Sequence, residues 1–297
     1  MAWLTGPYQS EFMRNALAIA VIVGVLCPVV GVWVVLRRLA YLGDAMSHAT
    51  LSGVALAYLV GASIVAGALA AGLVMGGLIA VLGSRKVSDD AVIGVVGTVL
   101  FATGVIIISR SGGVGVDLTH FLFGQITTVS PADVRLNSGL AAVALVIVTV
   151  LHRDLLAATF DPVHARQVGV RVDALRLVVL FLVSICVVVS LQTVGLLMSV
   201  AMLVTPAATA RLVTQRLGTM TAVAVGVGLL AAVGGLSLSY HLASPPGATI
   251  ALVAASIFLV VFVVSAVGTR GWRGRPRTKL RPSKPPIPID RRVSYGS

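Results

Sequence analysis

Nine long apolar segments run through most of this 297-residue chain. A helix of about 20 mostly apolar residues crosses the hydrocarbon core of a bilayer. Only helices and closed barrels satisfy their backbone polar groups in lipid, so segments of this length predict transmembrane helices. We expect spans close to residues 15–36, 39–60, 62–83, 91–109, 134–151, 175–193, 195–212, 219–241 and 248–267. The predicted fold class is therefore all-α, a polytopic membrane protein.

Two of these segments fit a full span less well than the others. The second carries Asp44 and His48, and the seventh contains Thr205-Pro206, which disturbs a helix. The sixth and seventh are separated only by the short stretch QTVGLL. The sequence therefore predicts eight to nine transmembrane helices. Only 11% of the residues are charged, against about 25% in soluble domains, and this deficit excludes a soluble protein.

The chain divides into three parts: a short N-terminal segment, residues 1–14, a transmembrane domain, residues 15–267, and a basic tail, residues 268–297. The net charge is +12, and two thirds of that excess lies in the Pro-rich tail. Such a composition cannot bury a core, so we expect the tail to be disordered. A basic segment beside a membrane span is expected to lie at anionic lipid on the cytoplasmic side, and we expect no nucleic-acid partner.

The arginines and lysines between the spans predict the orientation, because cytoplasmic loops of membrane proteins are enriched in them. If the tail is cytoplasmic, the segments on the outside contain only Arg14, Arg110 and Arg135. The cytoplasmic segments then contain Arg37, Arg38, Arg85, Lys86, Arg153, Arg166, Arg171, Arg176, Arg211 and Arg216. The asymmetry predicts a multi-pass protein of the cell membrane with a cytoplasmic C-terminus and an outside N-terminus.

Asp44 and His48 stand out in the stretch RRLAYLGDAMSHATLSG, residues 37–53. Residues four apart share one face of a helix, and an ionisable residue inside a span indicates function because its burial in hydrocarbon is costly. A carboxylate and an imidazole suit Mn²⁺, Zn²⁺ or Fe²⁺ better than Cu⁺. Two ligands are too few, since Zn²⁺ takes about four and Mn²⁺ about six. A second copy of the chain, related by a symmetry axis, would supply two more.

Structural explanations of the same pair stay open at this point. Gly43-Asp44 could form a break and an N-cap at the start of the second helix. Asp44 could instead pair with Arg37 or Arg38 at the level of the lipid headgroups, and His48 could donate to a backbone carbonyl. Two other functions are also compatible with the pair: an intramembrane enzyme that uses Asp44 and His48 as acid and base, and a gradient-driven metal transporter. The sequence contains neither a G-x-x-x-x-G-K-[ST] loop nor an H-E-x-x-H motif, so we expect no ATP hydrolysis by this chain and no zinc protease.

The longest predicted cytoplasmic segment is HRDLLAATFDPVHARQVGVRVDALR. Asp161 followed by Pro162 is typical of an N-cap and a first helical position, and Gly169 of a helix end. These signals predict a short helix over residues 162–168. A short capped helix on the cytoplasmic side suits docking of a soluble partner, and the alternative is a helix that lies on the lipid surface.

Five stretches carry a resemblance to a known family. In chain order they are GVWVVLRRLAYLGDAMSHATLSGVALAYLVG, FLFGQITTVSPADV, FDPVHARQVGV, VGLLMSVAMLVTPAATA and SPPGATIALVAA. Together they resemble the membrane permease subunit of the ABC-3 family, the importers of manganese, zinc and iron that receive metal from a solute-binding protein. The resemblance runs from about Phe12 to Val264 and leaves the basic tail outside.

The resemblance implies a fold and a set of partners. It implies a type II ABC importer-like permease that forms a homodimer, with two separate ABC ATPase subunits on the cytoplasmic side and one metal-binding solute-binding protein on the outside. The function implied is that of a permease subunit of a prokaryotic, ATP-driven importer that works by alternating access. No permanently bound cofactor is expected, and the transported ion is Mn²⁺ or Zn²⁺, or else Fe²⁺.

The resemblance also implies roles for particular residues. Asp44 and His48 match the Asp-x-x-x-His pair that contacts the metal in transit. The stretch FDPVHARQVGV matches the segment that couples the permease to its ATPase, which assigns ATPase coupling to Phe160, Asp161, Pro162, Ala165 and Gly169.

Overall fold

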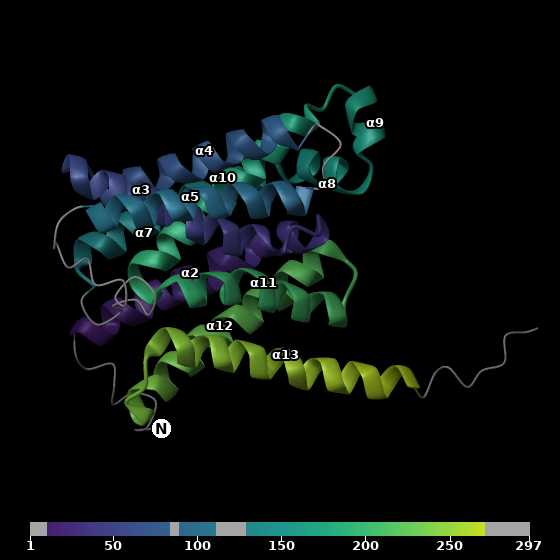
Figure 1. Ribbon diagram of the computed structural model, residues 1–297. Coiled ribbons are helices and arrows are strands. Elements are labelled where there is room, and N and C mark those ends of the chain that lie inside the picture. Colours follow the sequence, from purple (N-terminus) through teal and green to yellow (C-terminus); the bar gives the residue numbers. More distant parts are fainter. Residues whose placement is uncertain (1–10, 84–88, 111–128, 271–297) are drawn as a thin grey trace, which may run out of the picture.

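The computed structural model describes residues 11–83, 89–110 and 129–270 (Figure 1). Within these ranges the chain forms helices and no strands. The helices are α2 (Glu11–Leu36), α3 (Leu42–Val60), α4 (Ile64–Leu82), α5 (Asp89–Arg110), α7 (Pro131–Val150), α8 (His152–Phe160), α9 (Pro162–Gln167), α10 (Val172–Val194), α11 (Leu196–Val213), α12 (Leu217–Leu242) and α13 (Pro246–Arg270). Beyond Arg270, the predicted basic tail lies outside the described residues.

Every segment predicted to span the membrane forms one long helix, so the all-α fold class is confirmed. In the described ranges, seven helices are long and apolar enough to cross a membrane: α2, α4, α5, α7, α10, α12 and α13. The two long helices outside this set, α3 and α11, are the two segments that fitted a span less well. The break between α10 and α11 falls at Gly195, whose φ of 86° ends one helix and allows the next to begin. The sequence did not predict α8 as a separate helix.

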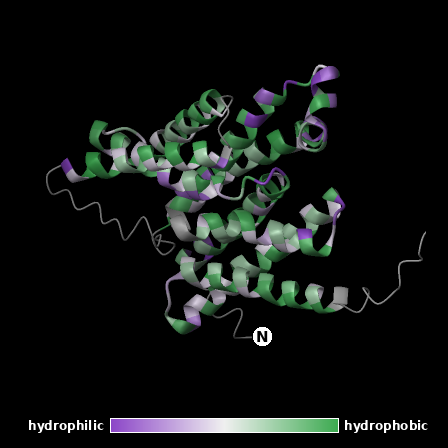
Figure 2. Ribbon diagram, turned by 45° about the vertical axis from the view of Figure 1, so that its right-hand side comes forward, coloured by the Kyte–Doolittle hydropathy of each residue, from purple (hydrophilic) through white to green (hydrophobic). Residues whose placement is uncertain are grey.

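The long helices lie side by side in one bundle (Figure 1). The beginning of α2 and the end of α13 lie at opposite ends of this bundle, and α8 and α9 project at the end where α13 finishes. Figure 2 shows that the helices are mostly hydrophobic along their length, whereas hydrophilic residues gather around α8 and α9. This end of the bundle is the one that the arginines predicted to be cytoplasmic.

Burial differs strongly among helices of similar hydropathy. In α10, 72% of the most apolar stretch is buried inside the protein, and in α2 the value is 67%, whereas in α13 it is 11%. A helix that is apolar on all sides can face either protein or lipid. The helices α2 and α10 therefore form the centre of the bundle, and α13 lies at its periphery.

Small residues allow helices to approach closely, and Gly72 and Gly76 lie four residues apart on α4. A Cβ at Gly72 would collide with the side chain of Ser184 on α10, and a Cβ at Gly76 would lie 3.4 Å from Leu180 one turn away. The face of α4 that carries both glycines thus packs directly against α10.

The chain reverses direction between α2 and α3 through a hydrogen-bonded turn. The amide of Arg38 donates to the carbonyl of Val35 at 3.2 Å, and the amide of Leu39 donates to the carbonyl of Val34 at 3.0 Å. This pair of bonds is the Schellman arrangement, which requires a left-handed residue after the helix. Arg38 occupies that position with a φ of 60°, which an arginine adopts only at a cost of about 1–2 kcal/mol. The turn fixes where α3 begins relative to α2.

Candidate functional site

Helix α3 begins at Leu42, and its N-cap position is Tyr41, which makes no side-chain cap. Asp44 therefore lies in the first turn of the helix and not at the cap, so the N-cap explanation of Asp44 is wrong. The partial positive charge at the beginning of α3 still favours a carboxylate there. His48 follows one turn later on the same face.

The two side chains face each other without a hydrogen bond. His48 Nε2 lies 3.6 Å from Asp44 Oδ1, beyond the normal hydrogen-bond range. Two ligands that bind one metal ion at about 2.1 Å each lie about 3.0–3.5 Å apart. The side chains of His48 and Asp44 are 42% and 43% exposed in a helix that is otherwise buried over most of its length. The second imidazole nitrogen, His48 Nδ1, is buried and has no hydrogen-bond partner among the described residues. The spacing and the exposure fit two ligands of one divalent ion.

The other polar side chains in this part of α3 are already bonded within the helix. The Ser47 hydroxyl donates to the carbonyl of Gly43 at 2.9 Å, and the Thr50 hydroxyl donates to the carbonyl of Met46 at 2.8 Å. The hydroxyl of Ser52 likewise donates to Ala49 at 2.7 Å. All three residues are also buried, whereas the side chains of Asp44 and His48 are partly exposed, so this pair is the one that can reach an ion.

Arg37 does not pair with Asp44. Its Nε donates to the hydroxyl of Thr159 on α8 at 3.0 Å. Its Nη2 is buried and has no hydrogen-bond partner among the described residues. Burial, and then the positive charge of Arg176, lower the pKa of the Arg37 guanidinium. The pairing of Asp44 with Arg37 that the sequence left open is therefore not formed, and Arg38 is exposed.

Helix α5 lies along the α3 face that carries His48. A Cβ at Gly97 would lie 3.0 Å from Ala45, and a Cβ at Gly104 would lie 2.8 Å from the backbone of Ser52. Between these two close approaches, the ring of Phe101 meets the ring of His48 edge to face, with centroids 5.0 Å apart. The sequence analysis missed this contact. The signal was available, because glycines seven residues apart indicate a packed helix face.

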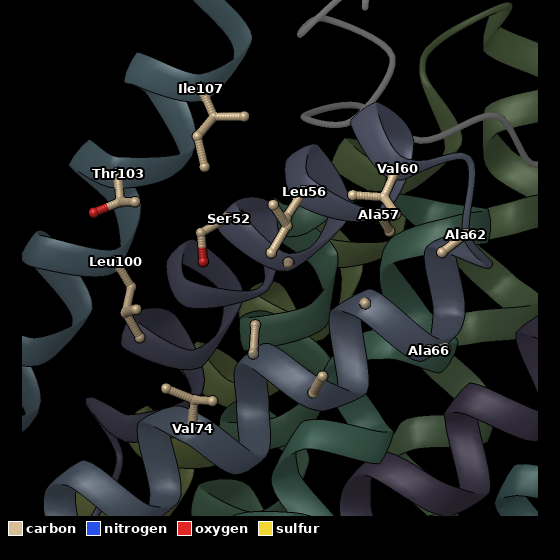
Figure 3. A pocket seen from close by; sticks show the side chains of 14 residues that line it. Ser52, Leu56, Ala57, Val60, Ala62, Ala66, Val74, Leu100, Thr103 and Ile107 are labelled. Carbon is tan, nitrogen blue, oxygen red and sulfur yellow. The ribbon is translucent and has the colours of Figure 1, made fainter.

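An apolar groove of about 520 Å³ begins one turn beyond His48 (Figure 3). Ser52 and Leu56 of α3 lie on one side of it, and Leu100 and Thr103 of α5 lie on the other. The Thr103 hydroxyl donates to a carbonyl of its own helix at 2.8 Å, as Ser52 does. The groove thus presents an apolar wall and adds no free ligand to the Asp44–His48 pair.

One copy of the chain supplies too few ligands for a complete metal site. In the part of the chain that the structure describes, no three His, Cys, Asp or Glu side chains come together. Asp117 and His120, the weaker candidate pair in a predicted outside loop, lie outside the described residues. Within the described residues, Asp44 and His48 therefore form an incomplete first shell.

The short helix predicted over residues 162–168 is confirmed as α9. Asp161 Oδ1 accepts a hydrogen bond from the His164 amide at 2.9 Å, and Pro162 occupies the first helical position. The helix ends at Gln167, and Gly169 adopts the left-handed conformation with a φ of 87°. The local signals therefore determine this helix, as expected.

The surface of α8 and α9 carries exposed apolar side chains on a segment that is packed firmly against the rest of the protein. Ala165 is fully buried, which holds α9 against the rest of the protein. Phe160 and Val163 are each 65% exposed. Arg166 and Asp173 form an exposed ion pair at 3.6 Å. Large apolar side chains held in place beside charged ones are typical of a protein-docking surface.

The comparisons with known proteins agree with this geometry. The ABC 3 transport family matches residues 9–265. The manganese transport system membrane protein MntC of Halalkalibacterium halodurans is 40% identical over 271 residues, which cover 89% of this chain and 92% of MntC. The manganese import system permease protein ScaB of Streptococcus parasanguinis is 36% identical over 264 residues, 89% of this chain and 94% of ScaB.

A solved structure gives the same result. PsaBC from Streptococcus pneumoniae, in complex with Fab, contains a chain that superposes with a TM-score of 0.77 at 35% identity, covering 88% of this chain and 94% of that one. The family match extends over nearly the whole membrane domain and includes α3 and the α8–α9 segment. With this fold, this set of spans and these matches, the chain belongs to the ABC 3 transport family and is the membrane-spanning permease subunit of an ABC transporter.

Proposed function

We propose that this chain is the permease of an ATP-driven importer of a divalent transition metal ion, and that Asp44 and His48 bind the ion during transit. The observation that supports the proposal is which polar side chains of α3 are hydrogen-bonded within the helix and which are not. The hydroxyls of Ser47, Thr50 and Ser52 are bonded to backbone carbonyls, while the carboxylate and the imidazole stay accessible and unbonded to each other. A pair of ligands left open inside a membrane protein favours ion passage.

Manganese is the ion that we propose first. The relatives MntC and ScaB are named for manganese transport and import. Oxygen and imidazole ligands suit Mn²⁺, and they also bind Zn²⁺ and Fe²⁺. Zinc and ferrous iron therefore remain alternative cargoes, and the ion is a substrate that is bound only during transport.

A second copy of the chain would complete the site. Two copies related by an axis next to α3 would bring together two carboxylates and two imidazoles, with water to fill an octahedral shell around Mn²⁺. A homodimer is the usual arrangement for a membrane protein that builds a site on a symmetry axis. The 42–43% exposure of Asp44 and His48 in one copy supports this proposal, because it leaves room for the other copy.

Two further kinds of partner are part of the proposal. An ABC ATPase would dock on the α8–α9 segment, where Phe160, Asp161, Pro162, Ala165 and Gly169 are the proposed coupling residues. A metal-binding solute-binding protein would deliver the ion at the opposite end. The concentration of arginines around α8 and α9 supports a cytoplasmic location for this end and for the C-terminus.

Alternating access places one physical requirement on the site. A ligand shifts a conformational equilibrium only if its affinity differs between the two states. We therefore expect the shared Asp44–His48 site to be assembled in one state and separated in the other.

Reconstitution tests the proposed function. The chain, its ATPase and its solute-binding protein are placed in liposomes, and uptake of ⁵⁴Mn²⁺, ⁶⁵Zn²⁺ and ⁵⁵Fe²⁺ is measured with ATP and with a non-hydrolysable analogue. We expect uptake of at least one of these ions only with ATP, and Mn²⁺ at the lowest concentration. Equal uptake by liposomes that lack the ATPase would contradict the proposal and favour a gradient-driven transporter.

A further inference from the structure

The inner end of α2 holds α8 at two points. The ring of Trp33 meets the ring of His152 at the beginning of α8 edge to face, with centroids 5.6 Å apart. One turn further along α2, Arg37 Nε donates to the Thr159 hydroxyl near the end of α8 at 3.0 Å. Two side chains of one helix thus contact both ends of another.

These contacts use a single face of α8. His152, Leu155 and Thr159 are three and four residues apart, so they lie on the same side of the helix. Leu155 between them is fully buried. The Thr159 hydroxyl donates its proton to the Leu155 carbonyl at 2.6 Å, which leaves its lone pairs free to accept from Arg37. The direction of the Arg37–Thr159 bond is therefore fixed by the local geometry.

On its other side, Arg37 leads directly into the turn before α3. The left-handed Arg38 and the bond from the Leu39 amide to the Val34 carbonyl define this turn. The amide of Leu42, where α3 begins, donates to the carbonyl of Leu39 at 2.9 Å. Arg37 is thus followed directly by a hydrogen-bonded turn that runs into the first turn of α3, which contains Asp44.

Thr159 stands next to the segment assigned to ATPase docking. Phe160 follows it directly, and Asp161 then caps α9. One hydrogen bond therefore joins the helix that precedes the docking segment to the turn that precedes the metal pair.

We propose that Arg37, through Thr159, is the positioning residue that transmits movement of α8 and α9 to Asp44 and His48. This inference rests on the proposed function, since it assumes an ATPase on α9 and an ion on α3. When the ATPase displaces α9, α8 moves with it, and the Arg37–Thr159 bond moves the turn at Arg38 and the beginning of α3.

The hydrogen bonding of Arg37 suits a contact that changes during a cycle. The guanidinium has five N–H donors, and Nη2 is buried without a partner among the described residues. An unmet buried donor destabilises the arrangement that contains it. Arg37 therefore has a spare donor that can take a new acceptor when α8 shifts.

The test measures transport and ATP hydrolysis in the same liposomes. The full complex of the chain, its ATPase and its solute-binding protein carries Thr159→Val, which keeps the shape of the side chain and removes the acceptor. The matched variant Thr159→Ser keeps the hydroxyl. On the arginine side, Arg37→Gln is compared with Arg38→Gln, which removes the same charge from the exposed neighbour. The readout is the number of ⁵⁴Mn²⁺ ions imported per ATP hydrolysed.

We expect Thr159→Val and Arg37→Gln to lower that ratio by about fivefold or more, the lower end of measured allosteric coupling. ATP hydrolysis and equilibrium Mn²⁺ binding should stay near wild type, because neither residue contacts the ATPase or the ion. Thr159→Ser and Arg38→Gln should keep the wild-type ratio. The double variant Thr159→Val with Arg37→Gln should be no worse than either single change, since both remove one bond.

Two results would overturn the inference. An unchanged ratio in Thr159→Val shows that the bond transmits nothing. A parallel fall of uptake and hydrolysis shows that the bond serves only to hold the docking surface in place. If the complex with Arg37→Gln does not assemble, the isosteric variant Thr159→Val still tests whether the bond transmits movement. A wild-type complex without ATP-driven uptake of any of the three ions would instead refute the proposed function, and the inference with it.

Discussion

Asp44 and Asp161 are both aspartates at the beginning of a helix, and the structure uses them in opposite ways. The Asp161 carboxylate is bonded locally, since Oδ1 accepts from the His164 amide at 2.9 Å. Asp44, in the first turn of α3, makes no cap, and its Oδ1 lies 3.6 Å from Nε2 of the ionisable side chain of His48. A carboxylate that satisfies its own backbone has a structural role, and one that is left unsatisfied inside an apolar domain indicates function.

Asp133 at the beginning of α7 supports this distinction. Its carboxylate accepts from both the amide and the hydroxyl of Ser130, at 3.0 and 2.7 Å, and Ser130 in turn caps the helix. This capping box lies at the end of the bundle opposite α9. Asp133 and Asp161 therefore stabilise their own helices, and Asp44 depends on packing by other helices for its position.

The largest effect on Mn²⁺ uptake is expected from substitutions of Asp44 and His48 themselves. Removing groups that merely support metal ligands lowers affinity or activity by about 10–100-fold, and loss of a ligand itself should reach at least the upper value. We therefore expect Asp44→Asn and His48→Ala each to lower ATP-driven Mn²⁺ uptake by at least about 100-fold, measured in liposomes with the ATPase present. Thermal stability should stay near wild type, because both side chains are partly exposed and unbonded.

The matched control for this pair is Asp90→Asn, which neutralises an exposed carboxylate near the beginning of α5. It should leave uptake unchanged. Normal uptake by Asp44→Asn and by His48→Ala would show that the open carboxylate has no role in transport, and the contrast with Asp161 would then have no functional meaning.

The next largest effect is expected on stability, from disturbing the packing of α5 against α3, which carries Asp44 and His48. In Gly104→Ala the new Cβ would lie 2.8 Å from the Ser52 backbone and force α3 and α5 apart, which should lower stability by about 1–3 kcal/mol. Gly77→Ala is the matched control, because a Cβ there meets nothing within 4 Å. Chemical unfolding in detergent should separate the two variants. Equal stability of both would show that the approach of α5 does not constrain α3.

The local parts of this structure could be predicted from the sequence. Apolar length alone located every long helix, because a span in lipid must be helical. Asp161, Pro162 and Gly169 located α9 to within one residue, because a cap, a first-turn proline and a left-handed glycine act on their immediate neighbours. The spacing of Asp44 and His48 likewise predicted that they share a face.

The tertiary parts could not be predicted in this way. The hydropathy of α10 and α13 is nearly the same, yet one is central and the other peripheral, since apolarity does not distinguish protein from lipid as a neighbour. The sequence offered Arg37 as a possible partner of Asp44, because its actual partner, Thr159, lies 122 residues away in the sequence. The ring contact of Phe101 with His48 also depends on how α5 packs against α3.

A smaller effect is expected from removing a local cap. Asp161→Ala should destabilise α9 by about 1 kcal/mol, the usual value of an N-cap, and should lower ATPase docking, measured as the affinity of the ATPase for the permease in detergent. Asp161→Ser keeps a capping oxygen and should restore docking. Asp133→Ala removes the carboxylate of the capping box at the far end and should leave docking unchanged. Weaker docking in Asp133→Ala would mean that the measurement reports general stability and not α9.

The smallest effect should come from the ring that holds His48. Phe101 contacts the imidazole edge to face, and such ring pairs contribute about 0.5–1.5 kcal/mol beyond the area that they bury. Phe101→Leu keeps an apolar side chain but loses this orientation, so the KM for Mn²⁺ uptake should rise by about 2- to 10-fold while the ions imported per ATP stay constant. Phe262→Leu on α13, which disrupts a ring stack far from α3, should leave the KM unchanged. Phe101→Leu could instead alter the number of ions imported per ATP and leave the KM unchanged. Phe101 would then act on coupling and not on His48. The position of His48 would in that case be determined by α3 alone, just as α9 is stabilised locally by Asp161.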